Sequence, residues 1–301
     1  MAAQDKRRER IICHFRQINY QLAVDEEKYE ATVSHPGLSA DDFDMRTTRP
    51  CVWKIMKAIG AARYFAHHAQ LDDTGRTFRD YAKLTDGQLT FLVASELVFT
   101  PDLYDYNVPK TPLIIKIQGG HIGNSSCNSV ATMLSRDNKF LCSNINQVVL
   151  IDKDTRRPMP LPDWWKSKYS KSAEGKRPVR FEKEVRPDKT SSFQIRIVWS
   201  DTDSNNHTNY ASYVRYAIDA AHFISKQGEI DEIKDMLNNG ISKLEMLYLG
   251  ESTEGDVLHI FMWARQSTQN RIIVQMDKED STVFQCCMYY FENPLPNEVI
   301  S

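Results

Sequence analysis

The sequence lacks several features that would place it in a specialised class of protein. Its 301 residues include only 12 glycines and 12 prolines, too few for a collagen-like or low-complexity chain, and 41% are hydrophobic. The charges nearly cancel, with 38 lysines and arginines against 40 aspartates and glutamates, so no overall field favours nucleic acid. No run approaches the roughly 18 apolar residues that a membrane span needs. The composition therefore indicates a globular protein with a sizeable core, in one large domain or two domains.

Metal and cofactor motifs are also absent. The six cysteines are scattered, and none forms the C-x-x-C spacing typical of zinc or redox sites. No glycine-rich phosphate loop or dinucleotide fingerprint appears, so the sequence predicts no cofactor and no metal. The first 15 residues are basic but have no apolar stretch behind them, so we expect no secretory signal and a cytoplasmic location.

The chain shows a helix followed by strands, twice. In the first half, Val52, Ile55, Met56 and Ile59 recur at helical spacing, and strand-like runs follow at 89–100, 113–118, 129–134 and 140–151. In the second half, a strand at 193–199 precedes an amphipathic helix over 210–224, with further strand-like runs at 242–249, 256–263, 271–276 and 283–291. The sequence thus predicts an α+β fold in which each half is a long helix wrapped by a curved antiparallel sheet.

Composition also suggests where the chain divides. We expect a charged N-terminal arm at 1–27, an N-terminal half at 28–162, a linker rich in proline and lysine at 163–190, and a C-terminal half at 191–293. Trp164 and Trp165 lie in this linker, and we expect them to pack across the two halves.

The most informative segment is DTDSNNHTNY, from Asp201 to Tyr210, between a predicted strand and the amphipathic helix. Asp and Asn are common in turns and helix caps, so an ordinary connection is one interpretation. The other is a catalytic site. His207 places an imidazole near the helix N-terminus, where backbone N–H groups and the helix dipole favour developing negative charge. A thioester carbonyl oxygen acquires such a charge under attack.

This segment resembles the D-x-D-x-N-x-H-x-N motif of hotdog-fold acyl thioesterases, and most closely that of the double-hotdog acyl-ACP thioesterases. Residues 149–162, VLIDKDTRRPMPLP, resemble the end of the first hotdog in that family, and 248–252, YLGES, fill the place of its second carboxylate. The resemblance extends from about residue 35 to 292. It implies a tandem hotdog that hydrolyses fatty acyl-ACP or acyl-CoA to a free fatty acid, with no cofactor beyond water.

The resemblance also implies roles for individual residues. Asp203, Asn205, His207 and Glu251 would form the active site, with Glu251 or Asp203 as general base or nucleophile; the sequence leaves that choice open. Asn205 and the amides of the helix N-terminus would bind the carbonyl oxygen. His207 would hold the other groups in place or protonate the leaving thiolate. The N-terminal hotdog would be non-catalytic and supply an acyl-chain tunnel. The substrate-binding residues would be Thr208, Asn209, Tyr210, Val52, Ile55, Met56 and Ile59.

The sequence departs from the family at two positions. Tyr210 stands where many relatives have a second Asn, and Ser252 where some plant relatives have Cys, which excludes a cysteine nucleophile at that position.

Two other functions stay open. A hotdog hydratase or dehydratase resembles D-x-N-P-x-H, with a Pro and one more residue than the segment from Asp203 to His207. A non-catalytic acyl-chain binding protein would need neither Asp203 nor Glu251, and the sequence contains both. The partners we expect are acyl-ACP or acyl-CoA and the acyl carrier domain of a fatty acid or polyketide synthase, with the chain a monomer or a homodimer.

Overall fold

A computed structural model describes residues 2–293 and 295, apart from 229, 231, 232, 234, 235 and 265–269. The chain forms two compact units. Unit 1 comprises Met1–Arg49, Lys57–Leu92 and Tyr106–Val179, and unit 2 comprises Pro50–Met56, Val93–Asp105 and Arg180–Ser301. Each unit combines helix with antiparallel sheet, which confirms the predicted α+β class.

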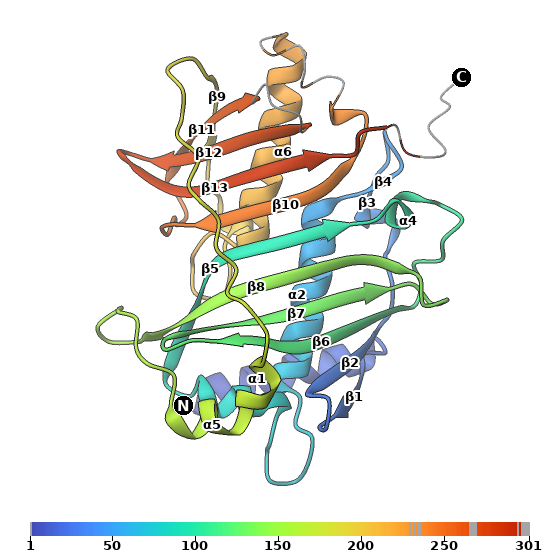
Figure 1. Ribbon diagram of the computed structural model, residues 1–301, viewed down its shortest axis with the longest axis vertical. Coiled ribbons are helices and arrows are strands. Elements are labelled where there is room, and N and C mark those ends of the chain that lie inside the picture. Colours follow the sequence, from blue (N-terminus) through green and yellow to red (C-terminus); the bar gives the residue numbers. More distant parts are fainter. Residues whose placement is uncertain are drawn as a thin grey trace. The chain divides into compact units, whose positions relative to one another are not determined.

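Unit 1 contains a sheet in the order β1 (Gln21–Asp25), β2 (Glu30–His35), β6 (Leu113–Ile122), β7 (Ser126–Leu134) and β8 (Phe140–Asp152) (Figure 1). Its helices are α1 (Ala2–Gln17), most of α2 (Val52–His68), α3 (Tyr81–Leu84) and α5 (Asp163–Tyr169). Arg63 of α2 donates hydrogen bonds to the carbonyl oxygens of Asn144 at 2.7 Å and Ser129 at 3.2 Å. The helix is thereby bonded to β8 and β7 as well as packed against the sheet.

The remaining short elements are β3 (Phe43–Asp44), β4 (Arg49–Pro50) and the 3₁₀ turns η1 (Ala40–Asp42), η2 (Phe78–Asp80), η3 (Ser170–Ala173) and η4 (Trp199–Asp201). Strand β1 lies inside the segment that we expected to be a charged arm, and it pairs with β2 in an antiparallel ladder. Residues Gln21–Asp25 are therefore part of the sheet of unit 1.

Unit 2 contains the second part of β5 (Gln88–Phe99), followed in the sheet by β10 (Ile241–Tyr248), β13 (Ser281–Tyr290), β12 (Arg271–Lys278), β11 (Val257–Ala264) and β9 (Ser191–Arg196). It also holds α4 (Pro101–Tyr104) and α6 (Tyr210–Gln227). The apolar stripe of α6 is buried, and the ring of Tyr213 stacks on Phe284 of β13 with centroids 5.0 Å apart. Helix α6 ends at Gly228, whose φ of 69° suits a glycine cap.

Helix α5 packs inside unit 1. Trp165 is 1% exposed in an apolar cluster with Leu84, Cys127, Leu150, Leu161 and Tyr169. Its Nε1 donates to the carbonyl oxygen of Arg79 at 2.8 Å. The expectation that the tryptophan pair packs across the two halves is therefore wrong for Trp165. Its neighbours in this cluster all lie in unit 1.

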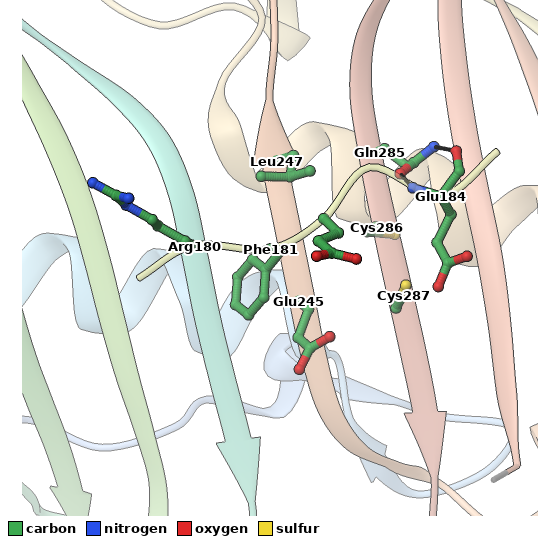
Figure 2. Close-up of a pocket in the computed structure, with 9 residues that line it drawn as sticks. Arg180, Phe181, Glu184, Glu245, Leu247, Gln285, Cys286 and Cys287 are labelled. Atoms are coloured by element: carbon green, nitrogen blue, oxygen red, sulfur yellow. Dashed lines mark hydrogen bonds between the residues drawn. The ribbon is translucent and has the colours of Figure 1, made fainter. Parts of the chain in front are cut away.

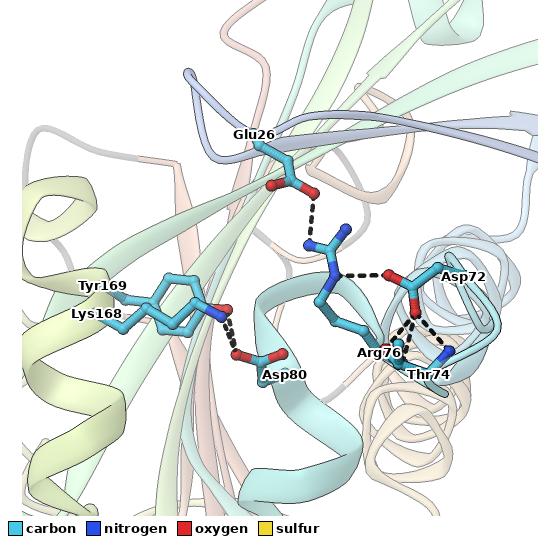
Figure 3. Close-up of polar contacts among 7 residues, drawn as sticks. All are labelled: Glu26, Asp72, Thr74, Arg76, Asp80, Lys168 and Tyr169. Carbon is cyan, nitrogen blue, oxygen red and sulfur yellow. Dashed lines mark hydrogen bonds and ion pairs between the residues drawn. The ribbon is translucent and has the colours of Figure 1, made fainter.

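Charged contacts fix the loop after α2 within unit 1 (Figure 3). The carboxylate of Asp80 accepts hydrogen bonds from Lys168 at 2.6 Å and Tyr169 at 2.9 Å, both from the α5 segment. Arg76 bonds to Asp72 in the same loop and to Glu26 in the turn between β1 and β2. The loop is thus tied to two other parts of the unit.

The second part of the predicted linker lies along the sheet of unit 2. Glu184 and Gln285 of β13 exchange two hydrogen bonds, at 2.7 and 2.9 Å (Figure 2). A cavity of about 210 Å³ lies beside residues 180–184. Two of the carboxylates that line it are engaged, because Glu184 pairs with Arg271 at 3.2 Å and Glu245 accepts from Tyr289 at 2.8 Å. The hydrogen bonds between Glu184 and Gln285 hold this segment on the sheet.

Among the described residues, no helix is long and apolar enough to cross a membrane.

Candidate active site

The polar segment after β9 closes into a tight turn. Oδ1 of Asp203 accepts the backbone N–H of Asn205 at 2.7 Å and that of His207 at 3.4 Å. The N–H of Asp203 donates to the carbonyl of His207 at 2.8 Å. Asn206 has a φ of 62°, a conformation that Asn tolerates better than most residues. Asp203, Asn205 and His207 are thus held in one turn, with the Asn205 side chain exposed.

The turn lies beside the segment that follows β10. An isolated antiparallel bridge pairs His207 with Thr253, and Thr208 donates its N–H to the carbonyl of Ser252 at 2.8 Å. In an antiparallel pair, diagonal neighbours share a face. His207 and Glu251 stand in this relation, and Nε2 of His207 lies 3.5 Å from Oε2 of Glu251. Their side chains are 23% and 38% exposed, so a substrate can reach both.

A buried aspartate anchors the turn to α6. Asp201 is 5% exposed, and its carboxylate accepts hydrogen bonds from the guanidinium of Arg215 and from the N–H of Val198. Its carbonyl accepts the N–H of Asn209 at 2.8 Å and the hydroxyl of Ser212 at 3.1 Å. The motif resemblance implied no role for Asp201. Asp201 is the first residue of the motif, and Arg215 lies in the helix that follows it.

The helix N-terminus is capped within the chain. Asn209 is the N-cap of α6, and its side chain accepts the N–H of Ala211 at 3.0 Å. The N–H of Ser212 donates to the carbonyl of Asn209 at 2.8 Å. We expected the amides of this helix end to bind the carbonyl oxygen of a substrate. The amides of Ala211 and Ser212 instead donate to the Asn209 cap in this structure.

The residues expected to bind the acyl chain are mostly core residues. Val52, Ile55, Met56 and Ile59 of α2 are at most 5% exposed. Tyr210 is partly buried, and its hydroxyl donates to the carbonyl of Met56 at 2.7 Å, which joins the first turn of α6 to α2 within unit 2. This contact gives Tyr210 a structural partner.

Two tyrosines beneath the turn keep their protons. Burial raises the pKa of Tyr213 above its ordinary value and that of Tyr248 well above it. Tyr248 donates its hydroxyl to the carbonyl of Tyr210 at 3.2 Å, and the rings of both tyrosines contact Phe284. They act as neutral hydrogen-bond donors and supply no acid or base at neutral pH.

The described part of the chain contains no group of three or more His, Cys, Asp or Glu side chains that could hold a metal ion.

Solved structures identify the fold. An acyl-ACP thioesterase from Bacteroides thetaiotaomicron superposes with a TM-score of 0.66 at 17% identity, covering 89% of this chain and 100% of that one. The 12:0-ACP thioesterase from Umbellularia californica gives 0.64 at 14% identity, covering 87% and 94%. No protein-family model and no curated protein sequence matches the chain. The chain therefore has the tandem hotdog fold of these thioesterases, which confirms the fold that the motif resemblance implied.

Proposed function

We propose that the protein is an acyl thioesterase whose active site lies in unit 2, around His207 and Glu251. The observation that carries this proposal is the 3.5 Å contact between the imidazole and the carboxylate, at a partly exposed position beside the Asp203 turn. A carboxylate next to an imidazole can activate water and return a proton. The tandem hotdog fold shared with two thioesterases supports the same reaction class.

In the proposed reaction, Glu251 takes a proton from a water molecule as that water attacks the thioester carbonyl carbon. The carbonyl oxygen gains negative charge, and the exposed side-chain amide of Asn205 donates a hydrogen bond to it. The carbon–sulfur bond then breaks, the departing thiolate takes a proton from the imidazolium of His207, and His207 regains a proton from Glu251. The products are a fatty acid and a free thiol, with no cofactor required.

Glu251 suits the role of base better than Asp203. Oδ1 of Asp203 already accepts two backbone N–H groups, whereas Oε2 of Glu251 faces the imidazole. We therefore assign Asp203 to holding the turn. The choice that the sequence left open is resolved in this proposal in favour of Glu251.

The proposed substrates are fatty acyl-ACP and acyl-CoA, in the cytoplasm. Tyr210 and Asn209 would contact the substrate near the scissile bond. An acyl carrier domain of a fatty acid or polyketide synthase is the proposed donor, and the protein would act as a monomer or a homodimer.

The test is release of thiol from acyl-CoAs and acyl carrier proteins bearing chains of six to eighteen carbons. We expect the wild-type protein to release thiol from at least one of them, and Glu251→Gln to lower kcat by about a hundredfold or more. Glu254→Gln is the matched control, because Glu254 is an exposed carboxylate three residues further on. Absence of thiol release from every substrate, or equal rates for wild type and Glu251→Gln, would remove the proposal.

A further inference from the structure

Three buried hydroxyl groups lie directly behind the His207–Glu251 pair. The Oγ of Ser252 is 2.8 Å from Oγ1 of Thr208 and 2.7 Å from the hydroxyl oxygen of Tyr213. Ser252 is 0% exposed, Thr208 6% and Tyr213 3%. We call Thr208, Ser252 and Tyr213 the hydroxyl cluster.

The three hydrogens of the cluster can all be placed. Tyr213 donates to Ser252, Ser252 donates to Thr208, and the Thr208 hydroxyl donates to the carbonyl of Ser252, 3.1 Å away. The same carbonyl accepts the Thr208 N–H. Every hydroxyl hydrogen then has an acceptor, and a buried polar network that is fully bonded holds its members in one arrangement.

The cluster is connected to both members of the proposed catalytic pair through the backbone. Thr208 follows His207 and Ser252 follows Glu251, and the two segments run antiparallel. Successive side chains on such segments point to opposite faces. The faces that carry Thr208 and Ser252 meet in the interior, and so His207 and Glu251 project together on the other side.

Tyr213 links this arrangement to the rigid part of unit 2. Its ring lies on α6 and stacks on Phe284 of β13, with an angle of 17° between the planes. Burial keeps its hydroxyl protonated, so it remains a donor. The positions of two loop segments are thereby set from a helix and a strand, and not by the loops alone.

We propose that the hydroxyl cluster of Thr208, Ser252 and Tyr213 is a positioning device that fixes His207 against Glu251. The inference rests on the proposed thioesterase function and adds three positioning residues to it. It also gives Thr208 a role different from the substrate contact that the sequence suggested, since its hydroxyl is bonded inside the protein.

Thr208 offers a matched pair of variants. Thr208→Val keeps the shape and removes the hydroxyl, and Thr208→Ser keeps the hydroxyl. We expect Thr208→Val to lower kcat by about tenfold to a hundredfold with KM unchanged, because the catalytic groups are displaced while binding is retained. Thr208→Ser should restore most of the lost kcat. A substrate-binding role would instead raise KM in Thr208→Val.

Two further variants separate positioning from general stability. Tyr213→Phe keeps the ring stack and should lower kcat with KM unchanged. Tyr290→Phe is its control. Tyr290 is a buried tyrosine that pairs with Ile241, at the start of β10. Tyr248 is seven residues further along the strand, which is about 23 Å at roughly 3.3 Å per residue. Removing the Tyr290 hydroxyl should leave kcat within about twofold of the wild-type value.

A readout independent of activity is hydrogen exchange at the Thr208 amide, which donates to Ser252. Exchange should be about tenfold faster in Ser252→Ala than in wild type, and unchanged in Tyr290→Phe. Full kcat in Thr208→Val and Tyr213→Phe would overturn the inference, as would unchanged exchange in Ser252→Ala. If wild-type protein released no thiol, the proposed function would fail, and exchange would still decide whether the cluster orders the loop.

Discussion

Nε2 of His207 and Oε2 of Glu251 lie 3.5 Å apart because two segments distant in sequence pair in one register. His207 bridges to Thr253, which puts Glu251 diagonally opposite the imidazole. A slip of one residue would turn Glu251 to the other face of the segment and into the position of Ser252. The pair therefore depends on the contacts that set this register.

Asp203 offers a test of its assigned role. Asn keeps a side-chain oxygen that can accept the N–H groups of Asn205 and His207, and Ala does not. Because we assign Asp203 to the turn, Asp203→Asn should retain kcat within about tenfold, while Asp203→Ala should lose about a hundredfold. Steady-state thiol release measures both. Equal and severe losses would show that the negative charge of Asp203 takes part in the chemistry.

The pair of Asp201 and Arg215 should matter for stability. Removing one partner of a buried ion pair leaves the other charge uncompensated, at about 3–5 kcal/mol for full burial. Arg215 is 34% exposed, so we expect Arg215→Ala to lower the free energy of unfolding by about 1–3 kcal/mol. Urea unfolding of the variant and of Arg196→Ala, an exposed arginine on β9, gives the comparison. Equal stability of the two variants would contradict the anchoring role of Asp201.

Gly119 of β6 should not tolerate a side chain. A Cβ at this position would lie 2.5 Å from Cζ of Arg79, a buried guanidinium that lies 4.8 Å from the ring centroid of Trp165. Overpacking of this kind costs about 1–3 kcal/mol, so Gly119→Ala should lower the midpoint of thermal unfolding. Gly175→Ala is not a suitable control, because its φ is 69°. Gly123→Ala is a suitable control, since a Cβ at Gly123 would lie 3.4 Å from its nearest neighbouring atoms. Equal melting temperatures for the two variants would show that Arg79 moves aside freely.

Stability should fall when the solution is acidified below pH 6.5. Burial lowers the pKa of His35 from 6.5 to about 4, against an opposing effect of Asp42, and burial also lowers the pKa of His68 to about 4. Between these values the unfolded chain binds protons that the folded chain excludes, so the stabilisation present above pH 6.5 is lost as the pH falls toward 4.

His35→Gln should reduce this dependence. We expect the wild-type protein to lose about 1–3 kcal/mol more than the variant between pH 7 and pH 4.5, measured by urea unfolding at both values. Identical pH dependence in the two proteins would mean that His35 titrates alike in the folded and unfolded states.

Much of the fold could be predicted because its long elements have strong periodicity. The stripe over 210–224 and the strand-like runs of the second half correspond to α6 (Tyr210–Gln227) and to strands such as β11 (Val257–Ala264). Strands β1 and β2 were not predicted. Their pattern alternates, but the buried positions of β2 are Ala31, Val33 and His35, which give a weak apolar signal in a charged region.

The site was predictable in its residues and less so in their contacts. The motif placed Asp203, Asn205 and His207 together, and the structure holds them in one turn. The hydroxyl cluster depends on which side chains of the two segments face inward. That is set by the pairing of two segments far apart in sequence, which no local pattern specifies.

The most direct test of the account is a double-mutant cycle on thiol release with His207→Gln, Glu251→Gln and the double variant. If the two side chains act as a unit, each single change should lower kcat by about a hundredfold or more, and the double variant should be little slower than either. Losses that multiply in the double variant would show that the two residues act independently, and the proposed catalytic pair would be wrong.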